Sequence, residues 1–89
     1  DIKNIEKIYK AAAREDLLIE VLTFALKNGI SKDQEHFVFL LRKFIQEEKA
    51  ADVIYWANGY KKVYPEFTED MNVVINLVNK EAWDILKKL

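Results

Sequence analysis

The chain has 89 residues, of which 51% are hydrophobic and 33% are charged, with only two Gly and one Pro. This composition is too apolar for a disordered chain and too charged for a membrane protein, and it has too few turn residues for a β-sandwich or a Rossmann unit. The net charge of −1 leaves no strong field to attract nucleic acid or a membrane surface. We therefore expect residues 1–89 to form one all-helical domain around a single core.

The composition and the N-terminal residues also predict the cellular setting. The chain has no Cys, which excludes disulfides, thiol catalysis and Cys-based zinc sites. The longest apolar run, residues 37–41, is far shorter than the ~20 residues that span a bilayer. Charges interrupt the apolar residues of segment 1–7, so it is not typical of a signal peptide, and Asp1 in place of Met suggests a trimmed chain or an excised domain. We expect a soluble, cytoplasmic protein.

Two helices are predicted at the N-terminal end, over residues 2–13 and 16–28. Apolar residues recur there in steps of three and four, first at Ile2, Ile5, Ile8, Tyr9 and Ala12, then at Leu18, Val21, Leu22, Ala25 and Leu26. The charged triplet 14–16 interrupts this pattern and favours a break with Asp16 as the N-cap. One long bent helix over 2–28 fits the same residues.

The boundary at residues 27–34 has the strongest local signals in the chain. Gly29 suits the left-handed position that follows a helix C-terminus, and Ile30 can supply the apolar contact that accompanies it. Ser31 followed three residues later by Gln34 matches a capping box. These residues predict that one helix stops at 28 and that the next begins near 32.

The C-terminal part is predicted to hold three helices and one loop. The helix over 32–48 is apolar around more than half of its circumference, which predicts that it is the most buried. A short helix over 51–58 should end at Asn58-Gly59, and residues 60–67 form a loop because Pro65 disfavours helical geometry at Tyr64. Thr68 is expected to cap an unbroken last helix over 69–88. The fold expected is a compact all-α bundle of about five helices.

No residue pattern points to catalysis. His36 has no second His or Cys with which to bind a metal, and its neighbours predict a solvated first helical turn. Ser31, the only serine, is assigned to capping, and adjacent carboxylates such as Glu47 and Glu48 diverge around a helix. The two glycines lie too far apart to form a phosphate-binding loop. We expect no enzymatic activity, no cofactor and no metal site.

One spacing resembles the helix-turn-helix family of DNA-binding proteins. Ala25, Gly29 and the following Ile30-Ser31 match the small residue, the turn glycine and the hydrophobic position of that motif. The family places an apolar residue about six positions after the glycine, where this chain has Glu35. The resemblance implies a nucleic-acid-binding or transcriptional regulatory domain, although carboxylates at the start of the second helix oppose contact with phosphates.

Large apolar residues away from the helix stripes are the candidates for partner binding. At 100° per residue, Phe39, Trp56 and Trp83 fall among polar residues on their helices. They are either covered by a second layer of the core or available as anchors for a partner, since Trp and Tyr are favoured in interface hot spots. In the aromatic segment 55–67, Tyr60 and Tyr64 flank Lys61 and Lys62, a pattern that is also compatible with stacking on unpaired bases.

These residues lead to a functional expectation. We expect a small regulatory or adaptor protein, or a helical domain of a larger protein, that binds another protein through its helix faces and segment 55–67. The partner could also be a second copy of the chain. Nucleic acid is the alternative partner, and no membrane association is expected.

Overall fold

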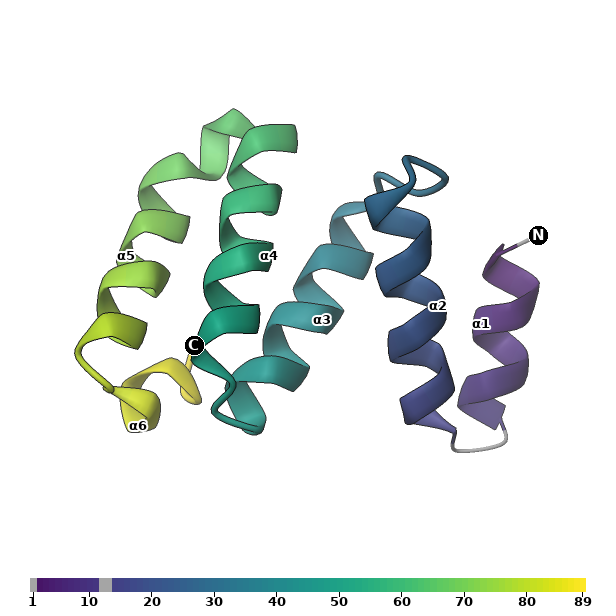
Figure 1. The fold of residues 1–89 in the computed structure, drawn as a ribbon, viewed down its shortest axis with the longest axis horizontal. Coiled ribbons are helices and arrows are strands. Elements are labelled where there is room, and N and C mark those ends of the chain that lie inside the picture. Colours follow the sequence, from purple (N-terminus) through teal and green to yellow (C-terminus); the bar gives the residue numbers. More distant parts are fainter. Residues whose placement is uncertain (1, 12–13) are drawn as a thin grey trace. The chain divides into compact units, whose positions relative to one another are not determined.

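The computed structural model describes the backbone of residues 2–11 and 14–89, and the side chains of these except residues 2, 3, 6, 9 and 11. This part of the chain contains helices and turns but no strand, which confirms the all-α class. The elements in chain order are α1 (Ile2–Ala11), α2 (Glu15–Lys27), α3 (Gln34–Gln46), α4 (Ala50–Val63), the short 3-10 helix η1 (Pro65–Phe67), α5 (Thr68–Asn79) and α6 (Trp83–Leu86) (Figure 1).

The chain divides into two compact units, residues 1–36 and 37–89. In the first unit α1 packs against α2, whose buried residues are Leu18, Leu22 and Ala25. In the second unit α4 and α5 lie side by side, joined through η1 (Figure 1). Its buried apolar residues come from α3, α4, α5 and α6 and include Leu40, Phe44, Val53, Ala57, Val78 and Leu86. Whether the whole chain behaves as one domain stays a prediction.

A break separates the first two helices, as one of the two alternatives predicted. Arg14 is the non-helical residue that precedes α2, while the predicted end of the first helix at 12–13 lies outside the described residues. Asp16 is not the N-cap, because its carboxylate instead accepts two hydrogen bonds from the Arg14 guanidinium, at 3.2 and 3.3 Å. These hydrogen bonds lower the pKa of the exposed Asp16 carboxyl.

The predicted termination at Gly29 is confirmed. Gly29 has φ of 70°, and the Ile30 amide donates to the carbonyl of Ala25 at 2.9 Å, the six-residue hydrogen bond of a Schellman motif. The Ile30 side chain is largely exposed, and the apolar contact expected of it stays a prediction. The capping box is also wrong, because α3 begins only at Gln34 and the Ser31 hydroxyl accepts a hydrogen bond from the Asp33 amide at 3.2 Å.

Two further helices end in the same motif without a glycine. Glu48 and Glu81 take the left-handed position, with φ of 54° and 55°. In the residue that follows each glutamate, the backbone amide donates a hydrogen bond back to the helix. The Lys49 amide donates to the Phe44 carbonyl and the Ala82 amide to the Leu77 carbonyl, each at 2.9 Å. The helix predicted over 32–48 therefore ends at residue 46, and the unbroken helix predicted over 69–88 is wrong because it stops at residue 79 and restarts at 83.

The segment around Gly59 also differs from the prediction. The helix does not end at Asn58-Gly59 but continues through Val63, and residues 65–67 form η1 instead of part of an open loop. Tyr60, in the added turn, is buried, and its burial offsets the low helix propensity of Gly59. Thr68 is not a cap, because its hydroxyl donates to the carbonyl of Pro65 at 2.6 Å.

The strained turn at Glu81 gives a stability prediction. Glu81→Gly should raise the free energy of unfolding by about 0.5–1 kcal/mol, because Gly adopts positive φ without the steric cost that an L-residue carries there. Chemical denaturation measures the change. Glu81→Ala, which removes the carboxylate but keeps Cβ, is the control and should not stabilise. Equal stabilisation by both variants would contradict this explanation.

Candidate functional site

The aromatic residues of segment 55–67 form a cluster around Phe37. The Phe37 ring lies edge-on to Trp56, Tyr60 and Tyr64, with ring centroids 6.1, 5.6 and 6.4 Å away. Phe67 closes the cluster at 5.4 Å from Tyr60. Trp56 and Tyr60 are only 5% and 3% exposed, so both take the covered alternative and serve the core of residues 37–89. Tyr64 is half-buried.

The other two large apolar candidates lie outside this ring cluster. Phe39 on α3 is half-buried, and the Lys43 ammonium lies 5.7 Å from its ring centroid, a cation–π contact. Trp83 is half-buried at the start of α6. Its predicted place among polar residues assumed one continuous helix over 69–88, and the turn at residues 80–82 interrupts that helix.

The two lysines of the aromatic segment have different surroundings. Lys61 is half-buried, and its ammonium donates to the Asn72 side-chain oxygen at 2.8 Å, which ties α4 to α5. Lys62 is exposed. The Tyr60 ring between the helices is covered, so this segment does not offer Tyr60 and Tyr64 as a pair of open stacking faces.

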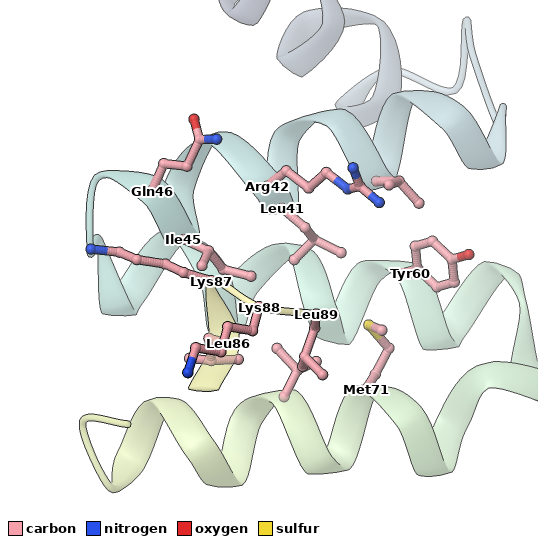
Figure 2. A pocket seen from close by; sticks show the side chains of 12 residues that line it. Leu41, Arg42, Ile45, Gln46, Tyr60, Met71, Leu86, Lys87, Lys88 and Leu89 are labelled. Carbon is pink, nitrogen blue, oxygen red and sulfur yellow. The ribbon is translucent and has the colours of Figure 1, made fainter. Parts of the chain in front are cut away.

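The structure shows a groove at another place in the second unit. Of the partner-binding residues predicted from the sequence, only Tyr60 lines it. The groove has a volume of about 380 Å³ and lies between α3, α5 and the C-terminal residues (Figure 2). Its lining consists mainly of apolar side chains, namely Val38, Leu41, Ile45, Tyr60, Met71, Val74, Leu86 and Leu89. The remaining lining residues are Arg42, Gln46, Lys87 and Lys88.

Burial separates the floor of the groove from its rim. Leu41, Val74 and Leu86 are buried, and Met71 is half-buried. The four polar lining residues, Arg42, Gln46, Lys87 and Lys88, are all exposed. The groove thus has an apolar floor and a polar rim, and the charged side chains in the lining are all cationic.

The C-terminal residues form one wall of the groove, and one ion pair helps to hold them there. The Lys87 ammonium lies 2.6 Å from the Glu48 carboxylate, on the turn that follows α3. Both side chains are well exposed, so this pair contributes at most about 1 kcal/mol. The apolar contacts of the buried Leu86 side chain therefore carry most of the attachment.

The groove could not be recognised from the sequence, because its lining residues occupy the same apolar helix positions as core residues. Met71, Leu41 and Ile45 lie on the apolar stripes of their helices, and nothing in the stripes shows that a groove separates them. Of the two cations that interrupt the mainly apolar segment 37–45, Arg42 and Lys43, Arg42 lines the groove and is a local signal that this face of α3 meets solvent.

The environment of His36 differs from the expected solvated surface. The ring is 3% exposed, and its Nδ1 lies 2.7 Å from the hydroxyl oxygen of Ser31, which is also buried. The Asp33 carboxylate is 4.0 Å from the same nitrogen. In a catalytic triad the Ser and the acid contact opposite ring nitrogens. Here both lie at Nδ1, so the arrangement fits a polar contact that fixes the start of α3.

The residues that resemble a helix-turn-helix have mixed surroundings. Gly29 makes the left-handed turn, but Ser31 is buried, with its hydroxyl against the His36 ring. Asp33 and Glu35 are exposed at the start of α3, where a DNA-reading helix would face phosphates.

Comparison of the chain with protein-family models, with curated proteins and with solved structures gives no match.

Among the described residues, no group of three or more His, Asp or Glu side chains is placed to hold a metal ion. Within the same part of the chain, every helix is too short or too polar to cross a membrane.

The different burial of the two tryptophans can be tested by truncation. Trp56→Ala should lower the free energy of unfolding by about 3–5 kcal/mol, because it removes a buried ring and leaves a cavity beside Phe37. Trp83→Ala, the comparison variant, should cost clearly less because its ring is half-buried. Urea denaturation followed by circular dichroism measures both. Equal losses for the two variants would contradict the difference in burial between the two rings.

Proposed function

We propose that this protein is a non-catalytic protein–protein interaction module, a cytoplasmic regulatory or adaptor domain, and that the groove between α3, α5 and the C-terminal residues is its docking site. The observation that carries the proposal is the combination of an apolar floor with an exposed polar rim in a single concave surface. Interfaces between proteins have this anatomy, with apolar contacts at the centre and polar groups around them.

Two features of the groove support a protein partner. Met71 contributes a flexible side chain to the floor, and methionine adapts readily to the shape of an incoming apolar group. Leu89, also in the lining, is 72% exposed and so has apolar surface that a partner can cover. Of the residues expected from the sequence, Tyr60 also lines the groove, while Trp56 contributes mainly to the core.

Site-specific photo-crosslinking tests the proposal. A benzophenone amino acid at Gln46, on the exposed rim, should form a covalent adduct with a second protein when the variant is irradiated in cells of its source. The same group at Lys62, which is exposed but does not line the groove, is the control and should form no such adduct. Mass spectrometry of the adduct identifies the crosslinked protein.

Two floor variants make the crosslinking result specific. Met71→Glu places a charge in the apolar floor and should abolish the Gln46 adduct, while Met71→Leu keeps the volume and should retain it. An adduct with a second copy of the chain would support the module and identify the partner as itself. Adducts that are equal at Gln46 and Lys62, or that contain nucleic acid, would overturn the proposal.

A further inference from the structure

The chemistry of the groove also narrows the kind of partner, on the assumption that the proposed function is correct. We infer that the groove binds an acidic amphipathic helix, with its apolar stripe against the floor and its carboxylates facing Arg42 and Lys88. Three separate features of residues 37–89 favour such a helix: the shape of the groove walls, the spacing of the floor residues and the charge of the rim.

The shape of the walls favours a helical segment over an extended one. Extended peptides are commonly captured by pairing with the edge of a β-sheet, and the described part of the chain has no strand to supply one. The groove is bounded instead by two helices, α3 and α5, and by the C-terminal turn (Figure 2). Surfaces of this type bind helices through side chains spaced three, four and seven residues apart.

The spacing of the floor residues matches such a helix. On α3 the lining positions are Val38, Leu41 and Ile45, which follow one another at steps of three and four residues. On α5, Met71 and Val74 are three residues apart. Residues 86–89 lie between α3 and α5 (Figure 2), so a third helix would insert its ridge of side chains between the two rows beside these residues.

The charge of the rim favours acidic flanks on that helix. Residues 37–89 contain eight Lys or Arg and eight Asp or Glu, so the second unit as a whole has no excess positive charge. The groove lining that the structure describes nevertheless includes three cations and no carboxylate side chain. This local concentration of positive charge would attract acidic segments and repel basic ones.

Two of the three rim cations are available to a partner. Lys87 is engaged by Glu48 at 2.6 Å. Arg42 and Lys88 are exposed and make no ion pair with any residue that the structure describes. Arg42 can additionally hold a carboxylate through two parallel hydrogen bonds, which gives orientation as well as attraction.

Fluorescence anisotropy with synthetic peptides tests the inference. The probe is a labelled peptide of about 18 residues, or five helical turns, with Leu at helical spacing and Glu on both flanks of the stripe. It should bind the full chain, and its affinity should fall as salt is added. A matched peptide with Lys in place of Glu, and one with a central Pro that breaks the helix, should each bind at least about tenfold more weakly.

Charge-reversal variants locate the binding. Arg42→Glu combined with Lys88→Glu should reverse the preference, so that the Lys peptide binds better than the Glu peptide. Lys7→Glu combined with Lys80→Glu makes the same change in net charge at exposed residues outside the groove and should leave the preference unchanged. Thermal unfolding of both variants confirms that they remain folded.

The outcomes separate this inference from the proposed function. Equal binding of the Glu and Lys peptides, or equal binding of the Pro peptide, would overturn the acidic helix, while the Gln46 adduct would still support docking in the groove. Failure of all three peptides would overturn the inference whatever the crosslinking gives. Binding of dodecanoate or anionic phospholipid vesicles, in the absence of peptide binding, would also overturn it and assign the groove to a lipid.

Discussion

The left-handed turn at Glu81 determines where the C-terminal residues lie, and the groove depends on it. A helix continuing past Asn79 would extend away along the axis of α5. The turn instead redirects the chain into α6, so that Leu86 is buried and Leu89 lines the groove. Holding the non-glycine residue Glu81 at positive φ costs free energy. The hydrogen bond from the Ala82 amide to the Leu77 carbonyl and the burial of Leu86 offset this cost. One backbone conformation thus links local strain to the shape of the candidate site.

Aromatic burial explains why segment 55–67 is part of the core. Phe37 contacts Trp56, Tyr60 and Tyr64 edge-on, and these contacts favour the extension of α4 beyond Gly59. The unfavourable propensity of one glycine in a helix is about 1 kcal/mol, while burying an aromatic side chain contributes about 2–3 kcal/mol. Ring burial therefore outweighs the glycine propensity, and the Trp56 and Tyr60 rings are used within the core of residues 37–89.

The groove forms where α3, α4, α5 and the C-terminal residues do not pack closely against one another. Its lining comes from α3, α4 and α5 and from residues 86–89, which are far apart in the sequence. Apolar side chains on helix stripes normally meet in a core, but here several of them face a cavity whose rim is exposed and cationic. This arrangement explains why residues that belong to ordinary stripes, such as Met71 and Ile45, become candidates for recognition.

The sequence by itself determined the helical class and the termination at Gly29, and it offered the break before α2 as one of two alternatives. These features follow from local rules, because the periodicity of apolar residues and the conformational freedom of glycine act over a few residues. Only the tertiary structure decided the ends of α3 and α5 at left-handed glutamates, the length of α4 and the burial of Trp56 and His36. Each of these depends on contacts between residues distant in the chain, whose packing energy exceeds the local preferences against them. The groove also depends on tertiary contacts. The apolar stripe of one helix does not show which of its side chains remain uncovered after the other helices have packed.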